Sequence, residues 1–504
     1  MARRTRLDRV TGAFLRVFDS PKLFWIFFGV FLAAALFMAI SGIFSMAYDE
    51  YVHLGIARLY THQWSPFFSS QPASTDIFGV ITRDPSYLYH FLISFPLRIF
   101  AHFCHAFMAQ VIFLRLFSIA FFAIGLLLFR AAFQRAGVPL RVRNLALCFF
   151  MVIPVVPFAA AQINYDTMLF MMVGLTVWLA VGVSRSLRID KKFPTLDAIW
   201  LTVTVLLASL VKYAFLPILL ALTVYFGVVL YRLYGWRLTG LGRQARRGLI
   251  GVSRWRLYLA VALLLLSAGL FGERYGVNMV RYHTPTPECN QVVSVERCQA
   301  YEPFARNYAY TQGHYPLPAY KVYAYPFNNW MRGMMRSLFF VVGNKETGYE
   351  PGEPLPMAYV GGYAVIVGGL LLTLIRLRWL WRRSHTNQLF MVIGGTYAGL
   401  LFVQNFMDFL HTHVPVAIQG RYLLPILPLF LVVVAQTALD LLRRLQRPKI
   451  SAALLAILCI LLLEGGSFLP FIIRGRDEWF WNAPLIQHAN KDIRAVLTPF
   501  IVKN

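Results

Sequence analysis

Long apolar runs that alternate with short basic blocks constrain this chain more than any other feature. A helical run of about 17–25 apolar residues can cross the hydrocarbon layer of a bilayer. The chain is 58% hydrophobic with a formal charge of +26, and its Lys and Arg residues cluster between the apolar runs. In a soluble protein this charge would suggest a nucleic-acid partner, but the spacing here follows the rule that basic loops stay on the cytoplasmic side. The sequence therefore predicts an all-α polytopic membrane protein.

The runs predict about eleven transmembrane helices, with the N-terminus in the cytoplasm and the C-terminus outside. On this topology all six basic blocks lie inside and most acidic residues lie outside, as the charge rule requires. The predicted spans are residues 24–46, 111–128, 144–161, 167–183, 196–210, 214–231, 257–272, 357–375, 388–410, 422–442 and 450–471.

This topology divides the chain into five parts, two of which carry long external loops. The first part is the cytoplasmic N-terminus, and the last is an external tail. In chain order the parts are residues 1–23, a transmembrane core over 24–272 with a first external loop over 47–110, a long external loop over 273–356, further transmembrane helices over 357–471, and the tail over 472–504.

Residues 85–107 are apolar but carry His90, Arg98, His102 and His105. If this segment crossed the membrane, the basic block at 130–143 would lie outside with no acidic residue near it, against the charge rule. We therefore expect one or two helices that lie along the membrane surface within the first external loop.

Two of the five cysteines share one polar loop. Cys289 and Cys298 lie in the predicted external segment, where an oxidising compartment would allow a disulfide. A metal site is the alternative, but the loop offers no further ligands at a useful spacing. The sequence favours the disulfide, and the other three cysteines read as small buried hydrophobic residues.

Two adjacent carboxylates, Asp49 and Glu50, follow the first apolar run where a membrane helix should emerge into water, and His53 comes one turn later. Residues at i and i+4 share a helix face, so Asp49 and His53 can point the same way. Such a group suits proton transfer at an interface. The alternative is an ordinary solvated helix end.

Other unusual polar residues collect at the same predicted membrane face. Charges at this depth are costly unless they are paired or face a water-filled cavity, so we expect such a cavity at the outer interface. Its cations suit a phosphate, and its carboxylates suit a hydroxyl that must lose a proton. Besides Asp49, Glu50 and His53, these residues are Arg83, Asp84, Asp166, Lys212, His411, His413, Gln419, Gly420 and Arg421.

Several of these residues also have a purely structural interpretation. Lys212 can be a helix-end lysine that reaches out to water, and Asp166 and Asp84 can stabilise the first turns of the helices that follow them. His411 and His413 read as interface residues rather than metal ligands. Arg421 is different, because an external arginine at the start of a span goes against the charge rule and so favours function.

The segment 301–330 is rich in tyrosine and ends with Trp330. Aromatic faces stack on sugar rings, but amphipathic aromatics also form belts at the level of lipid headgroups, and we favour the belt. The chain has no glycine-rich nucleotide loop such as GxGxxG or a Walker sequence, so a soluble nucleotide donor is not expected.

The arrangement of these features resembles the GT-C superfamily of membrane glycosyltransferases, in which an external Asp-Glu pair follows the first span. More narrowly, four blocks are similar to a bacterial membrane-protein family allied to that superfamily. The blocks extend from residue 49 to residue 425 and are Asp49-Glu50-Tyr51-Val52-His53, Asn164-Tyr165-Asp166, Val211-Lys212-Tyr213-Ala214-Phe215-Leu216-Pro217 and Gln419-Gly420-Arg421-Tyr422-Leu423-Leu424-Pro425.

The resemblance implies a multi-pass protein of a bacterial inner membrane whose active site faces the periplasm. It implies a sugar donor on a polyprenyl phosphate, transferred with inversion to a glycan, lipid or protein of the cell envelope. Carried onto this chain, Asp49 would be the general base, and Glu50 would position the acceptor or Asp49 itself. Arg421 and Lys212 would hold the departing lipid phosphate. The remaining substrate-binding candidates are His53, Arg83, Asp84, Asp166, Gln419 and Tyr422.

Some members of the superfamily need a divalent metal. This chain has no clear external Asp-x-Asp sequence, so we do not expect one here, and no other cofactor is implied.

Two other functions share this composition. A transporter or flippase for a lipid-linked sugar would place charged residues near the middle of several spans, whereas the charges here gather at one face. A polymerase or ligase of envelope glycans would share the external arginines but would not require the Asp-Glu pair.

Overall fold

The computed structural model describes residues 16–47, 49–235, 238–313, 315–339, 357–445, 457, 460 and 480–501. Within these residues the regular structure is helical, and the only β-type pairing is one isolated bridge between Gly42 and Phe480. This confirms the predicted all-α class for the described part of the chain.

Six described helices are long and apolar enough to cross a membrane, and one bent pair could add a seventh span. The pair is α19 (Met357–Ile375) and α20 (Leu377–Arg383), which meet at an angle of 73°. The predicted number of about eleven spans is therefore not confirmed. The six helices are α2 (Pro21–Ser41), α5 (Phe107–Arg135), α8 (Tyr165–Arg185), α10 (Leu216–Tyr234), α12 (Arg254–Phe271) and α21 (His385–Thr412).

The predicted span over residues 144–161 is not one helix. It is divided into α6 (Leu140–Met151) and α7 (Val155–Ala160). Pro154 lies at the break, and proline lacks the backbone N–H that a continuous helix would use.

Other predicted spans are shorter than expected or undescribed. The span over 196–210 is α9 (Thr195–Val211), with 17 residues, at the lower limit for crossing a bilayer. The span over 422–442 starts late, because the short 3₁₀ turn η6 (Gly420–Leu423) precedes α22 (Leu427–Leu445). The predicted span over 450–471 lies outside the continuously described residues.

The predicted long loop over 273–356 is largely helical where the structure describes it. Its first part continues α12 to Tyr282, ten residues beyond the predicted end at 272. Cys289 and Cys298 form the predicted disulfide, with an S–S distance of 2.07 Å. The elements are η4 (Gly272–Gly276), α13 (Val277–Tyr282), α14 (Cys289–Val292), α15 (Val295–Cys298), α16 (Glu302–Gln312), α17 (Ala319–Ala324), η5 (Tyr325–Met331) and α18 (Arg332–Phe339).

The first external loop and the C-terminal tail also contain helices. As expected, residues 85–107 hold a separate helix, α4 (Leu88–Phe103), which is not among the candidate spans. The other elements are α3 (Glu50–Tyr60) and η1 (Asp76–Phe78) in the loop, and α25 (Pro484–Ile501) in the tail.

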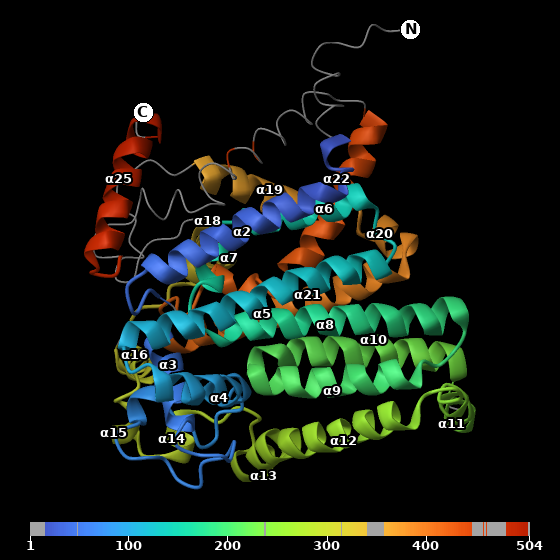
Figure 1. Ribbon diagram of the computed structural model, residues 1–504. Coiled ribbons are helices and arrows are strands. Elements are labelled where there is room, and N and C mark those ends of the chain that lie inside the picture. The colour runs from blue at the N-terminus through green and yellow to red at the C-terminus, as the bar shows by residue number, and fades with distance from the viewer. Residues whose placement is uncertain are drawn as a thin grey trace, which may run out of the picture.

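Helix α5 runs through the bundle and defines its two ends (Figure 1). With 29 residues it is about 43 Å long at 1.5 Å per residue. Its first residue, Phe107, lies under the guanidinium of Arg58 of α3, and its last, Arg135, pairs with Asp197 of α9. We call these the α3 end, which also carries α4 and α14–α16, and the α11 end, which carries α11 (Leu238–Arg247) and α20.

The centre of the bundle is the packing of α5 against α8. Gly125 and Gly174 allow the two backbones to approach, since a Cβ on Gly174 would lie 3.0 Å from the carbonyl oxygen of Gly125. Beside them Phe122 and Phe170 stack with ring centroids 4.2 Å apart. Small residues at a helix contact are typical of membrane bundles. This packing fixes the start of α8, where Asp166 lies, relative to α5.

Candidate functional site

Four charged side chains from distant parts of the chain meet at the α3 end. Asp166 Oδ1 lies 2.6 Å from the Lys212 Nζ, and the Arg421 guanidinium lies 3.8 Å from Asp166 Oδ2 and 3.5 Å from Asp49 Oδ2. We call these four residues the ion cluster. It takes one member from each of the four sequence blocks: Asp49 contacts Arg421, and both Arg421 and Lys212 contact Asp166.

Each member of the ion cluster sits at a helix boundary. Asp166 is in the first turn of α8, where the side chain of Asn164 accepts a hydrogen bond from the Asp166 backbone N–H at 2.8 Å. Lys212 is the residue between α9 and the short turn η3 (Tyr213–Phe215). Arg421 lies in η6. In an apolar helix an ionisable group has the lowest free-energy cost at a helix end. The charges of the ion cluster therefore meet where helices begin or end.

Asp49 is the exposed member of the ion cluster. Its side chain is 57% exposed, whereas those of Lys212, Arg421 and Asp166 are between 5% and 9% exposed. It precedes α3 with φ of 64°, in the left-handed region, and its carboxylate makes no capping hydrogen bond to the helix. Aspartate tolerates this backbone conformation better than most residues. The carboxylate is therefore held beside Arg421 and open to solvent.

Glu50, the neighbour of Asp49, is fully buried and has a different role. Both its oxygens accept hydrogen bonds from Arg115 at 2.8 Å, and they also accept from the backbone N–H groups of Met46 and Ile163. The side chains of Glu50 and Arg115 are 0% exposed. Glu50 therefore cannot touch an acceptor, and of its two predicted roles only the positioning of Asp49 fits this geometry.

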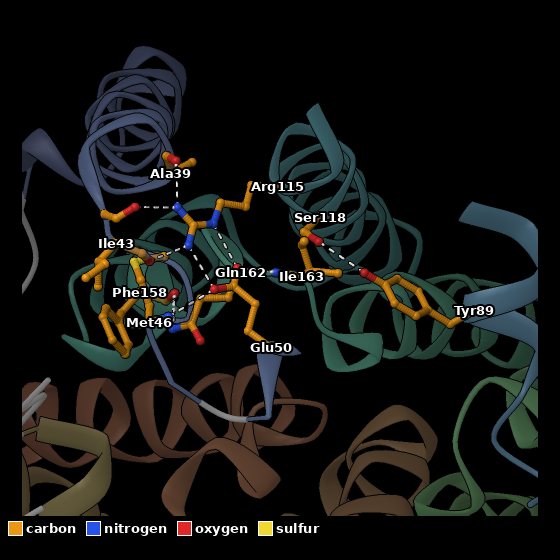
Figure 2. Close-up of polar contacts among 11 residues, drawn as sticks. Ala39, Ile43, Met46, Glu50, Tyr89, Arg115, Ser118, Phe158, Gln162 and Ile163 are labelled. Carbon is orange, nitrogen blue, oxygen red and sulfur yellow. Dashed lines mark hydrogen bonds and ion pairs between the residues drawn. The ribbon is translucent and has the colours of Figure 1, made fainter. Parts of the chain in front are cut away.

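Arg115 joins several segments around Glu50. Figure 2 shows its guanidinium between the carboxylate and the carbonyl groups of Ala39 and Ile43, and it also donates to the Gly42 carbonyl at 2.7 Å. The end of α2 and the starts of α3 and α8 are thus tied to α5. Sequence reasoning missed this residue, although an arginine inside a predicted span is itself a signal that a buried partner exists.

Aromatic rings and a glycine shape the cationic side of the ion cluster. The Lys212 ammonium lies 4.3 Å from the ring centre of Tyr165 and 5.0 Å from that of Tyr422, within cation–π range. Gln419 accepts a hydrogen bond from Arg421 Nε at 2.6 Å. Gly420 packs against α18 so closely that a Cβ would lie 2.3 Å from the Met334 carbonyl oxygen, which explains why this position needs glycine.

His53 forms a buried pair with His90 of α4, a residue that the sequence analysis did not assign to the site. Their Nδ1 and Nε2 atoms are 2.9 Å apart, and the ring of Tyr165 lies 4.4 Å from that of His53. Burial lowers the pKa of His90 to about 3, and burial together with His90, Arg421 and Lys212 lowers the pKa of His53 well below 6.5. Both rings are therefore neutral at neutral pH, and the pair links α3 to α4 beside the ion cluster.

Arg83 and Asp84 lie near the ion cluster but make no contact with it among the described residues. Arg83 pairs with Glu273 at 3.2 Å. Asp84 accepts from the backbone N–H of Ser86, whose hydroxyl accepts from the backbone N–H of Tyr213, next to Lys212. Asp84 does not cap α4, which begins at Leu88 without a side-chain cap and with no acidic residue in its first turn. Its carboxylate instead orders the turn at Ser86, which lies between Asp84 and the Lys212 segment.

The two histidines near the end of α21 are separate from the ion cluster. His411 is exposed, and His413 Nδ1 lies 2.6 Å from the Tyr315 carbonyl oxygen. Within the described residues, no group of three or more His, Cys, Asp and Glu side chains is close enough to hold a metal ion.

One buried atom points to a ligand. Asp166 Oδ2 is inaccessible to water and has no hydrogen-bond partner in the described structure; the Arg421 guanidinium lies 3.8 Å from it. Buried polar atoms in folded proteins are nearly always satisfied by protein or by an ordered molecule. A hydroxyl donor, from an ordered water or a ligand, would satisfy this atom.

Comparisons with known proteins do not place the chain in a family. No protein-family model matches the sequence, and no curated protein matches it significantly. The function that the four sequence blocks imply therefore remains a hypothesis.

Proposed function

We propose that the chain is an inverting membrane glycosyltransferase of the GT-C type. It moves a sugar from a polyprenyl-phosphate donor to a hydroxyl of a cell-envelope glycan, lipid or protein, at the periplasmic face of a bacterial inner membrane. The observation that carries the proposal is the ion cluster itself. An exposed carboxylate stands beside buried cations at one end of a bundle of apolar helices.

Asp49 supplies the base in this proposal. The acceptor oxygen attacks the anomeric carbon, the bond from that carbon to the phosphate oxygen breaks, and the acceptor proton passes to the Asp49 carboxylate. The leaving group is the polyprenyl phosphate. The exposure of Asp49 gives an acceptor access, and the buried pair of Glu50 with Arg115 holds the preceding chain in place. Positioned general bases of this kind contribute roughly 10²–10⁴ in rate.

Lys212 and Arg421 supply the site for the phosphate. Two cations face two carboxylates, so the ion cluster is neutral before a ligand binds. The donor adds one negative charge and the departing phosphate adds another. Cations with little access to water stabilise this developing charge more than solvated ones do. Arg421 offers a planar set of donors suited to phosphate oxygens.

The first prediction is that Asp49→Asn abolishes sugar transfer. The amide has the same shape but cannot take the proton, so we expect a rate loss of about 10²–10⁴-fold, with donor-lipid binding retained. Cells carrying the wild-type or variant gene would be compared by mass analysis of envelope glycans, lipids and surface proteins. Proteoliposome assays with the identified donor would then give the rates.

Two further variants make this test decisive. Asp49→Glu keeps a carboxylate and should retain measurable transfer, while Glu296→Gln removes an exposed acid from the same end of the bundle and should transfer normally. Full transfer by Asp49→Asn would remove Asp49 as the base. Lipid movement across the bilayer without a sugar product would instead indicate a transporter.

A further inference from the structure

A polar cavity of about 250 Å³ lies at the α11 end, opposite to the ion cluster. Its walls come from the turn between α5 and α6, the first turn of α21 and the second half of α22. None of the residues of the proposed active site lines it. The cavity is therefore a separate feature of the bundle.

Two arginines, Arg141 and Arg383, line the cavity together with the aspartate Asp440. Arg141 donates two hydrogen bonds to the Asp19 carboxylate, from Nε and Nη2, and the Asp19 side chain is 47% exposed. Arg383 lies 3.7 Å from Asp440, which Arg376 approaches more closely at 3.1 Å. Among these pairs three arginines face two aspartates, and an anion in the cavity would lie close to Arg141 and Arg383 but also to the Asp440 carboxylate.

The start of α21 adds a positive potential. Ser384 caps this helix of 28 residues, and the residues Ser384, Thr386 and Asn387 line the cavity. The N-terminus of a helix carries a partial positive charge and backbone N–H groups that suit an anion.

Asn387 gives independent evidence for a ligand. Its side chain lines the cavity, is only 2% exposed, and makes no hydrogen bond to any residue that the structure describes. Leaving a buried amide without partners is costly, and such groups normally contact protein or a bound molecule. The amide N–H₂ of Asn387 can donate to an anion placed between the two arginines.

We propose that this cavity binds the phosphate group of an anionic membrane phospholipid. Val138, Val142 and Leu439 also line it, so an apolar wall is available for the glycerol and the first acyl carbons. Basic pockets between membrane helices are known to hold anionic lipid headgroups. The bound phospholipid would hold the α5–α6 turn against α21 and α22. This role does not depend on any chemistry at Asp49.

The test is a titration of the purified full-length protein with phosphatidylglycerol or phosphatidylcholine, followed by native mass spectrometry. The first phosphatidylglycerol should bind about tenfold more tightly than phosphatidylcholine. Arg141→Gln combined with Arg383→Gln should remove this preference. Asn387→Asp keeps the side-chain shape but adds a negative charge, so it should also remove the preference for phosphatidylglycerol. This variant tests the proposal if the double arginine variant does not fold.

The matched control is Arg246→Gln with Arg247→Gln on α11, where both side chains are exposed and neither lines the cavity. This control should keep the preference within about twofold. An equal loss in the control would show general attraction to a basic surface and overturn the proposal, as would wild-type binding by Asn387→Asp. If millimolar inorganic phosphate displaced the first lipid completely, the cavity would be a site for free phosphate and not for a phospholipid.

Discussion

At the scale of single residues, the two adjacent carboxylates have opposite environments. Glu50 is 0% exposed and satisfied by Arg115 and two backbone N–H groups, whereas Asp49 is 57% exposed and lies beside Arg421. Two neighbouring acids can have different roles in one site when their environments differ in this way. The structure gives Glu50 a structural role, and our proposal assigns the chemical role to Asp49.

The His53–His90 pair makes a prediction about pH. Because burial depresses both pKa values in the folded state, the unfolded chain binds protons below pH 6.5 that the folded chain does not. Stability is therefore fully present above about pH 6.5 and falls as the pH drops toward 3, by up to about 1.4 kcal/mol per pH unit for each histidine. His90→Gln should reduce this slope between about pH 5 and 7.

Thermal unfolding of the detergent-solubilised protein at several pH values measures this slope. Glutamine at residue 90 can still accept a hydrogen bond from His53, so the variant should fold. His62→Gln is the control, since His62 is an exposed histidine outside the buried pair. If His90→Gln and wild type showed the same pH dependence, the neutral buried pair would be refuted.

At the scale of secondary-structure elements, buried polar contacts decide where helices stop and how they join. The end of α2 and the starts of α3 and α8 converge on Arg115 of α5, which binds three backbone carbonyl groups and Glu50 (Figure 2). Carbonyl groups at a helix end need such partners. One side chain therefore ties together three helix ends, two of which, the starts of α3 and α8, carry the cluster members Asp49 and Asp166.

We predict that Arg115→Met destabilises the protein by about 3–5 kcal/mol, because it leaves the Glu50 carboxylate buried without its partner. Glu50→Gln in the Arg115→Met background should recover part of that loss, since no uncompensated charge remains. Unfolding midpoints of the wild type, both single variants and the double variant form a double-mutant cycle. Strict additivity in this cycle would contradict the buried ion pair.

At the scale of the whole molecule, the two ends of the bundle differ in charge. The α3 end holds the acidic residues Asp49, Asp84 and Glu273, while α11 and α20 at the other end are rich in arginine. Basic segments next to membrane helices stay on the cytoplasmic side. On this rule we propose an orientation with the ion cluster outside and the α11-end cavity inside.

This orientation predicts opposite labelling of two exposed residues. Trp64, at the α3 end, is 76% exposed, and Ile250, which follows α11, is 80% exposed. A membrane-impermeant thiol reagent applied to spheroplasts should label Trp64→Cys, whereas Ile250→Cys should react only after lysis. Labelling of both variants from the same side would contradict a bundle that spans the membrane between these ends.

The sequence alone determined the helical class, the membrane-spanning character and the residues of the ion cluster, because apolar length, basic blocks and charges at helix ends are local properties. It also identified the disulfide from two cysteines in one polar loop. The tertiary structure decided which ionisable residues have a structural role, because their partners are distant in the sequence. Glu50 and Arg115 are 65 residues apart, and His53 and His90 are 37 apart. Pro154 likewise divides one predicted span into α6 and α7. Pairing across the bundle depends on the packing of α5 and α8, which no local pattern encodes.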